Sequence, residues 1–586
     1  MKNKKHWQQI ILGFVLVIIL VSHVLYVIKT AQFPQDDEHS YLALALQIHD
    51  ILKNQLASAP ADIIGISTYR QLLYPFILSI FLLIFGTSSS YKLLLIINVV
   101  FYCGTIIMTY LLARQFVSKT ASLIGSVIFA FYGFPLFYLH FLYSETATSF
   151  FVTLTLYFLA SSKNLEIYKK NILFSLSFAA GTLVRWMVPL FIIGPLGYSL
   201  VSSAIENYRK RKITILKKFI IMFLFGLVPM LVFYYIPKWT YFIEYIRGNM
   251  THSPIWVGKV SHLTQELRNT FSISSIMFYI DILSQQTVFF FILFCIGFFL
   301  CLRFWRKYLF LVLALVIPFF FLTFGSVFKQ DRFIVPLYPT VAIISAVTFD
   351  HMHRMKFKSI LILITLTLSL LNFFGASWAF GPMGGEGLAS ITLPHIINYP
   401  VRIYMTPVVW PPREEHTNAR LLIETILENR VDKNKKIIIL ATFSVYDIEN
   451  GITSISSYER RDDISIIFLR NLSKSDFMEF FERVKKSDFI LIKNKKPVDS
   501  YRYSNDEVVF MFDQFNAFYH SEHFALPGFR KIRTVKVPED NSSISIYIKE
   551  KTFSPENISG LGEAMIQFSP EYGTEIRQGM EELQSL

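Results

Sequence analysis

Apolar residues run in long stretches through the first 380 residues, and short polar segments separate them. A hydrocarbon core of about 30 Å requires roughly 20 apolar residues in a helix, with about 17 sufficient in places. The pattern therefore predicts eleven membrane-spanning helices. They lie at residues 10–28, 91–113, 120–142, 146–161, 171–184, 186–204, 219–237, 287–302, 308–325, 333–349 and 359–379.

One further apolar run, residues 74–85, is too short to cross a bilayer and is predicted to be an interfacial or re-entrant helix. The positive-inside rule supports this prediction, because Lys and Arg near spans are retained in the cytoplasm. With the N-terminus inside and residues 10–28 as an uncleaved span, 20 of the 31 basic residues before position 381 fall in short inner loops. Treating 74–85 as a span would move Arg114 and the basic cluster at 163–170 outside.

Composition agrees with a membrane protein, since 53% of the 586 residues are hydrophobic and only 17% are charged. The net charge of +14 is unevenly distributed: residues 1–380 hold 31 Lys and Arg against 13 Asp and Glu, and residues 381–586 hold 25 against 29. Most of the positive charge thus marks the cytoplasmic side and does not indicate a nucleic-acid partner. Disordered, collagen-like and disulfide-rich classes are also excluded.

The change in charge and the end of the apolar runs place a domain boundary near the glycine-rich segment Gly381–Gly387. Eleven crossings put everything after it on the outer face. Residues 381–550 are predicted to form an extracytoplasmic α/β domain, with helices at 417–430 and 474–486 and strands at 436–442, 489–493 and 543–549. Residues 551–586, rich in Gly, Glu and Gln, are predicted to be a flexible tail.

Acidic residues are scarce in the membrane half, so their positions are informative. Asp36, Asp37 and Glu38 are consecutive just beyond the first span, and an amphipathic stretch suited to a membrane surface, Tyr41–Leu52, follows them. Glu145 is the one acid between residues 63 and 165, at the predicted outer mouth of two spans. An acid at such a depth is costly and is a candidate functional residue.

Basic residues at the same predicted outer interface are candidates for holding a lipid-linked phosphate. They are Arg70, Arg185, Lys329 and Arg332.

Six segments taken in order resemble the GT-C glycosyltransferases of family 39 type, which include protein O-mannosyltransferases and the aminoarabinose transferase acting on lipid A. The segments are FPQDDEHSYLALA, YRQLLYPFILSIFLLIFG, LLARQFVSKTASLIGSVIFAF, YSETATSFFVTLTLYFLA, AAGTLVRWMVP and DRFIVPLYP, and the resemblance covers roughly residues 10–350. The resemblance implies a polytopic α-helical membrane fold with juxtamembrane helices in the first outer loop.

The resemblance also implies roles for particular residues. The catalytic Asp of the family's first-loop Asp-Glu pair matches Asp37, followed by Glu38, and the second acid matches Glu145. The family's arginine matches Arg185, although the chain reads VRWMVP with the proline displaced. The RQLLYP segment keeps Arg70 and Tyr74 but lacks the family's paired prolines, which makes the role of Arg70 less secure.

These residues suggest a hypothesis in which a sugar passes from a polyprenyl-phosphate donor to an acceptor hydroxyl on the extracytoplasmic side. Asp37 acts as general base in a single inverting displacement, and the basic residues offset charge on the leaving phosphate. Asp36, Tyr41 and Tyr74 are assigned to the donor and acceptor pocket. A divalent cation would suit the acidic cluster, and the candidate ligands are Asp36, Asp37, Glu38 and Glu145.

The acceptor stays open among a glycan, a lipid A-like lipid and a protein, and the predicted location is a multi-pass position in a bacterial plasma (inner) membrane. Two alternatives remain at this point. A transporter or flippase of lipid-linked glycan would place ionisable residues near the bilayer midplane, whereas here they gather at the outer rim. A membrane-anchored glycan-binding protein would need far fewer spans.

Overall fold

The structure is a computed structural model of the chain. The residues that it describes are 7–30, 37–66, 68, 70–86, 92–210, 215–240, 243, 273–284, 288–325, 329–352, 355–379, 390–392, 402–404, 412, 418–432, 435–441, 463–468, 476–493, 518–521, 524, 526–537, 542–550 and 554–585. They fall into two compact units. The helical unit runs to Pro412, and the C-terminal unit begins at Arg413 and also includes the start of helix α2, up to Ala43. The division thus lies about 25 residues beyond the predicted Gly381–Gly387 boundary.

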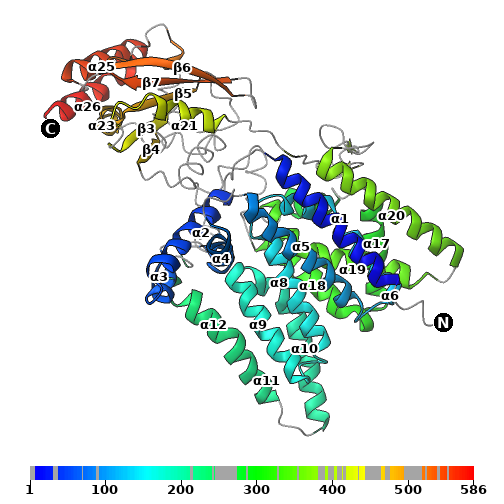
Figure 1. The fold of residues 1–586 in the computed structure, drawn as a ribbon. Helices are drawn as coiled ribbons and strands as arrows, with labels where there is room; N and C mark the ends of the chain where they lie inside the picture. The colour runs from blue at the N-terminus through cyan, green and yellow to red at the C-terminus, as the bar shows by residue number, and fades with distance from the viewer. Residues whose placement is uncertain are drawn as a thin grey trace. The chain divides into compact units, whose positions relative to one another are not determined.

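Six helical stretches of the described chain are long and apolar enough to cross a membrane. They are formed by α1 (Trp7–Lys29), α5 (Lys92–Ala113), α10 (Val188–Lys210), α18 (Trp305–Phe324), the 3-10 turn η4 (Asp331–Leu337) with α19 (Tyr338–Asp350), and α20 (Met355–Trp378) (Figure 1). Two bent pairs meet the same criteria: α6 (Lys119–Ala130) with α7 (Gly133–Leu139), and α16 (Ile273–Ser284) with α17 (Val288–Arg303).

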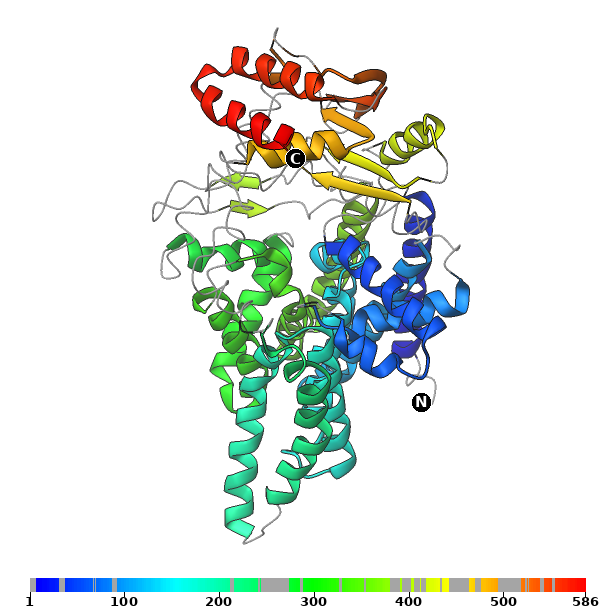
Figure 2. The same ribbon diagram turned by 90° about the vertical axis from the view of Figure 1, so that its left-hand side faces the viewer.

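The remaining predicted spans also coincide with helices. Both α8 (Glu145–Ser161) and α9 (Tyr168–Val184) contain 17 residues, which is near the lower limit for a crossing. The predicted span 219–237 falls, up to Tyr235, in a continuous helical stretch made of α11 (Ile215–Met222), the π-helical turn η2 (Phe223–Leu227), α12 (Val228–Met230) and the π-helical turn η3 (Leu231–Tyr235). This stretch lies beside α9 in both views (Figure 1, Figure 2). The chain is therefore a multi-pass membrane protein, while the count of eleven stays a prediction.

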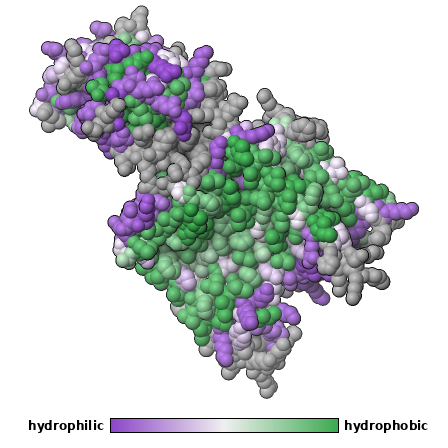
Figure 3. Space-filling view, viewed as in Figure 1, coloured by the Kyte–Doolittle hydropathy of each residue, from purple (hydrophilic) through white to green (hydrophobic). Residues whose placement is uncertain are grey.

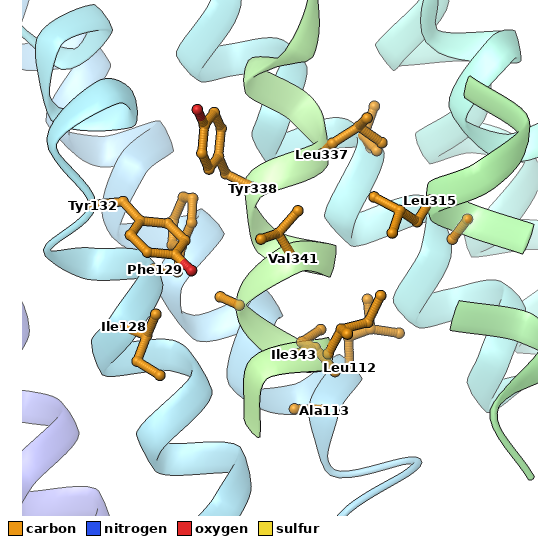
Figure 4. Close-up of a cluster of buried hydrophobic side chains, with 14 of the residues drawn as sticks. Leu112, Ala113, Ile128, Phe129, Tyr132, Leu315, Leu337, Tyr338, Val341 and Ile343 are labelled. Atoms are coloured by element: carbon orange, nitrogen blue, oxygen red, sulfur yellow. The ribbon is translucent and has the colours of Figure 1, made fainter. Parts of the chain in front are cut away.

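The centre of the helical unit is the stretch Asp331–Asp350, in which 94% of the residues are buried, against 33% for α1 and for α20. Small residues allow this close packing, because a Cβ at Gly297 would lie 2.0 Å from the Ile344 carbonyl oxygen. Tyr132 and Tyr338 are neighbours in the core (Figure 4), and their rings meet edge to face with centroids 5.5 Å apart. Leu315 of α18 and Leu112 of α5 complete the cluster around α19 (Figure 4).

The outer surface of the helical unit is apolar. Large hydrophobic side chains on α1, α10, α17 and α20 are exposed, and Figure 3 shows hydrophobic residues gathered over the face that carries α1. In a soluble protein such an area would be a liability, whereas lipid tails cover it at no cost.

Three short helices form a separate cluster outside the spans: α2 (Asp37–Asn54), α3 (Ala59–Gly65) and α4 (Leu73–Phe85). Leu44, Ile48 and Ile66 form the buried centre of this cluster, and Phe76 of α4 packs against it. The 13-residue α4 is the helix predicted to be too short to cross. Juxtamembrane helices in the first loop were implied by the family resemblance, and the fold confirms this.

The C-terminal unit is built on a five-stranded sheet with the order β4-β3-β5-β7-β6. Strands β3 (Ile437–Ala441), β4 (Ile464–Phe468) and β5 (Phe489–Lys493) are parallel, and β6 (Phe529–Val537) and β7 (Ser542–Lys549) are antiparallel additions. Helix α21 (Ala419–Glu428) covers one face, and α23 (Phe477–Lys486) lies on the other. The predicted helices at 417–430 and 474–486 and the strands β3, β5 and β7 are confirmed, whereas β4 and β6 were not predicted. A two-stranded antiparallel pair, β1 (Ser390–Thr392) with β2 (Arg402–Tyr404), precedes this unit.

The structure differs from the prediction of a flexible tail at 551–586. Residues 555–585 form α25 (Pro555–Phe568), the 3-10 turn η6 (Pro570–Tyr572) and α26 (Gly573–Ser585), and the two α-helices lie side by side (Figure 2). Their apolar side chains belong to the same buried cluster as α23 and β5. These side chains are Ile558, Leu561, Met565, Ile576, Met580 and Leu583.

Candidate active site

A buried carboxylate and two arginines meet at one end of the helical unit. Glu145 is the first residue of α8, and its side chain is 1% exposed. Because α9 packs alongside α8, the residue that follows its last turn, Arg185, reaches back and donates a hydrogen bond from Nη1 to Glu145 Oε1. Arg332, at the start of η4, brings Nε to 3.7 Å from the same oxygen. Three elements far apart in the sequence therefore converge on one carboxylate.

A second acid and the surrounding rings hold the arginines in place. Asp331 Oδ1 accepts hydrogen bonds from the backbone nitrogen of Arg332 at 2.7 Å and from the hydroxyl of Tyr138 at 3.0 Å. The guanidinium carbon of Arg185 lies 5.4 Å from the centre of the Phe333 ring, within cation–π range. These contacts position the backbone of Arg332 and the guanidinium of Arg185 beside Glu145.

Glu145 has one oxygen that remains available. Its Oε2 is buried and has no hydrogen-bond partner among the residues that the structure describes. A buried carboxylate oxygen without a partner is unfavourable, so this atom is suited to accept a proton donor such as a ligand hydroxyl. Guanidinium groups in turn suit phosphate oxygens. The cluster can thus contact both a hydroxyl and a phosphate.

The acidic residues of the first loop lie at the start of helix α2. Asp37 and Glu38 form its first turn, where the helix dipole favours negatively charged side chains. Glu38 and Tyr41 are buried, and burial lowers the pKa of the neighbouring His39 to about 4, so its imidazole is neutral at pH 7. Asp36 lies outside the described residues.

Lys329 does not join the Glu145 cluster. Its buried ammonium donates hydrogen bonds to the carbonyl oxygens of Leu322, at 3.3 Å, and Thr323, in the last turn of α18. A lysine in this position satisfies carbonyls that the helix leaves unpaired. Burial lowers the pKa of Lys329 to about 8.

Arg70 and Tyr74 lie in and just after the turn between α3 and α4. The Tyr74 side chain is fully buried, and its hydroxyl donates to Asn98 Oδ1 at 2.8 Å, which is a structural contact between α4 and α5. Arg70 is half-buried, and its backbone nitrogen donates to Thr68 Oγ1. The neighbouring Gln71 donates to the hydroxyl of Tyr234 at 2.7 Å.

Comparison with known families identifies the chain. A family model described as the Alg9-like mannosyltransferase family matches residues 65–392, which is more than half of the sequence. The chain belongs to the Alg9-like mannosyltransferase family. It is therefore a membrane glycosyltransferase, and the resemblance to the GT-C class is confirmed.

Two solved structures of ArnT support the same fold for this glycosyltransferase. The crystal structure of ArnT from Cupriavidus metallidurans bound to undecaprenyl phosphate is similar with a TM-score of 0.51 at 9% identity, over 91% of this chain and 97% of that one. The apo form of ArnT gives a TM-score of 0.50 at 9% identity, over 91% and 98%. The oligosaccharyltransferase AglB from Archaeoglobus fulgidus gives 0.47 at 12% identity, over 83% and 69%. No curated protein matches the sequence.

The family match covers the arginine cluster and leaves out the first-loop acids. Glu145, Arg185 and Arg332 fall inside residues 65–392, whereas Asp37 and Glu38 precede this range. The C-terminal unit also lies outside it.

Sequence reasoning did not single out Asp331 and Tyr138 as site residues of the glycosyltransferase. An acid directly before Arg332, in the segment KQDR, was a signal that was available. Tyr138 gave none, because a tyrosine inside an apolar run is usually a packing residue. Within the described part of the chain, no three His, Cys, Asp or Glu side chains gather as metal ligands.

Proposed function

We propose that this membrane glycosyltransferase transfers a sugar from a polyprenyl-phosphate-linked donor to an acceptor hydroxyl, on the extracytoplasmic side of the membrane and with inversion at the anomeric carbon. The observation that carries the proposal is the buried cluster of Glu145, Arg185 and Arg332 inside a family of mannosyltransferases. Undecaprenyl phosphate, the lipid in the similar ArnT structure, is the kind of product that such a reaction releases.

In the proposed step, Asp37 takes the proton of the acceptor hydroxyl while its oxygen forms a bond to the anomeric carbon. The bond between that carbon and the phosphate oxygen breaks, and its electron pair leaves with the polyprenyl phosphate. Arg185 and Arg332 offset the added negative charge on the leaving phosphate, where fixed donors act most strongly because water is excluded. Glu145 orients the two guanidinium groups through its ion pairs, and its Oε2 accepts a hydrogen bond from a hydroxyl of the acceptor or the donor.

The other predicted residues take lesser parts in this proposal. Glu38 and Tyr41 position α2 from its buried side, and Arg70 is retained as a second contact for the donor phosphate. Lys329 is assigned to the end of α18, since its ammonium already serves two carbonyls there. A divalent cation is not needed in the step, because the arginines supply the positive charge.

The family name points to mannose as the first sugar to test. It also favours an enzyme over the transporter and the binding-protein alternatives. The proposed sidedness rests on the positive-inside distribution, which puts the N-terminus in the cytoplasm of a bacterial plasma membrane and the C-terminal unit outside.

The role of Asp37 is tested by Asp37→Asn in the purified full-length protein, assayed with undecaprenyl-phosphate mannose and a panel of hydroxyl acceptors. Loss of a general base is expected to lower kcat by about 10²- to 10⁴-fold. Asp50→Asn is the matched control, because Asp50 lies in the same helix with a 39% exposed side chain that contacts His49. Activity of Asp37→Asn within twofold of the control would remove Asp37 from the mechanism.

A further inference from the structure

Two buried histidines link three spans to the segment that precedes Glu145. His23 of α1 and His140, which follows α7, bring their Nδ1 atoms to 3.3 Å. His23 Nε2 lies 3.0 Å from the carbonyl oxygen of Leu95 in α5, and His140 Nε2 lies 3.4 Å from the hydroxyl of Ser377 in α20. Both histidines are at least 94% buried.

These three contacts form a chain of hydrogen bonds from Leu95 through His23 and His140 to Ser377. The Leu95 carbonyl at its end fixes which atom donates in each bond. The Leu95 carbonyl can only accept, so His23 Nε2 carries a hydrogen, and a neutral His23 then accepts at Nδ1. His140 must therefore donate from Nδ1, which leaves its Nε2 to accept from the Ser377 hydroxyl. One pair of neutral tautomers satisfies all three contacts.

An aromatic ring also covers one face of His140. Tyr26 of α1 stacks on it with centroids 3.5 Å apart and planes inclined by 8°. The ring is thus fixed both in its plane, by hydrogen bonds, and perpendicular to it, by stacking.

His140 begins the α7–α8 link, residues 140–144, and residues on both sides of this link belong to the candidate active site. Tyr138, two residues before His140, donates to Asp331, and Glu145 follows five residues later. The carbonyl of the adjacent Phe141 accepts from the Asn98 side chain of α5. The link that leads into Glu145 is therefore held by side chains of α1, α5 and α20.

We propose that His140, held by His23 and Ser377, is a positioning residue for the reaction: it fixes the α7–α8 link against α1, α5 and α20, and so sets the place of Tyr138 and Glu145. This inference rests on the proposed function. Residues 140–144 lie outside both helices, so the side-chain contacts of His140 and of Asn98 contribute to where the link lies. Loss of the anchor shifts Glu145 and, through the shared ion pairs, Arg185 and Arg332.

Two variants of His140 distinguish a role in positioning the link from a role in filling space. His140→Phe keeps an aromatic ring for Tyr26 but removes both hydrogen bonds and leaves His23 Nδ1 without its donor. His140→Asn loses the ring but keeps a donor near the Nδ1 position. The proposal expects His140→Phe to lower kcat by about 10- to 100-fold with donor KM within threefold, and His140→Asn to retain clearly more activity. A residue that only fills space would give the opposite ranking.

Trp378→Phe is the matched control. It removes the 2.8 Å hydrogen bond from Trp378 Nε1 to Ser22 Oγ, which also joins α20 to α1, and keeps an aromatic ring beside Tyr26. We expect its kcat to stay within threefold of wild type. Deuterium exchange of the peptide 138–146 in the purified full-length variants should rise in His140→Phe and stay unchanged in Trp378→Phe.

The kinetic and the deuterium-exchange measurements distinguish failure of the proposed function from failure of the positioning role. If the wild-type protein consumes no polyprenyl-phosphate sugar, the proposed function is wrong, and the exchange data alone still decide whether His140 anchors the link. If His140→Phe matches or exceeds His140→Asn in kcat, or if exchange of 138–146 is the same in all variants, the positioning role is overturned.

Discussion

The guanidinium of Arg332 lies between the carboxylate of Glu145 and the rings of Tyr143 and Phe333. Contacts on three sides require a planar, delocalised cation, and a lysine ammonium cannot make them together. Arg332→Lys is therefore expected to lower kcat by about 10- to 100-fold while the donor KM changes less, because in the proposed step Arg332 offsets charge that develops on the leaving phosphate.

Steady-state kinetics on the purified variant check this expectation. Arg530→Lys serves as the control, since Arg530 is exposed and pairs with Glu550 in the C-terminal unit. An increase in KM alone would show that Arg332 binds the donor without favouring the transition state.

The buried side chain of His39 predicts that the stability of the folded protein depends on pH. Its pKa is about 4 in the folded protein and about 6.5 in the unfolded chain, because burial disfavours the imidazolium. Between these values the unfolded chain binds the extra proton, so stability is complete above pH 6.5 and falls as the pH drops towards 4. Thermal unfolding between pH 4 and 7 should show this loss in wild type and a smaller one in His39→Gln. Parallel pH curves for the two proteins would contradict the assignment.

Single residues of the site were predictable where charge is rare. Glu145 and Arg185 were both selected because an isolated acid and an isolated base at the edge of spans are costly unless they have a role. Their contact with each other was not predictable, since it depends on how α8 packs against α9. Lys329 was grouped with the arginines on position alone, and the sequence held no sign that its ammonium would turn to the end of α18.

At the scale of elements, glycine caused the main difference between prediction and structure. The residues from 551 onward were predicted to be flexible partly because they are rich in glycine. In the structure these glycines allow close packing instead: a Cβ at Gly562 would lie 1.9 Å from Met580 Sδ, and one at Gly579 would lie 2.8 Å from Phe477 Cβ. Ser554 and Asn557 form a capping box that starts α25, a signal present in the sequence.

The helices α25 and α26 should therefore be part of the cooperative core of the C-terminal unit. Leu561→Ala removes a fully buried side chain and is expected to destabilise this unit by about 2–5 kcal/mol. Glu563→Ala, two residues away and exposed, should have an effect within about 0.5 kcal/mol. Denaturant unfolding followed by protease susceptibility of the C-terminal unit measures both. Equal stability of the two variants would support a loosely attached tail.

Strands were predictable from the sequence where nearly all of their side chains are buried. The runs at β3 and β5 are buried and rich in Ile, Leu and Phe, so a short apolar segment between polar ones sufficed to indicate them. The strand β6 carries exposed Arg and Lys residues, and an irregularity between Lys531 and Arg533 interrupts its alternation. That break removed the periodic signal on which strand prediction depends.

At the scale of the whole molecule, the charge distribution makes a prediction about sidedness. The basic residues predict that the N-terminus and five loops lie in the cytoplasm and that the C-terminal unit lies outside. Alkaline phosphatase fused after Leu586 is expected to be active, and a green fluorescent protein at the same point to be dark, in a bacterial host that exports through the plasma membrane. The reverse pattern would require an even number of crossings and would move the proposed chemistry to the cytoplasmic face.

The central claim is transfer of a sugar from a lipid monophosphate donor by this member of the Alg9-like mannosyltransferase family. The most direct measurement incubates the purified full-length protein in lipid nanodiscs with undecaprenyl-phosphate mannose and hydroxyl acceptors. It follows release of undecaprenyl phosphate by mass spectrometry and the anomeric configuration of the product by NMR. The proposal predicts release that depends on the acceptor and a product with inverted configuration. Consumption of a nucleotide sugar with the lipid donor left intact, or a product with retained configuration, would contradict it.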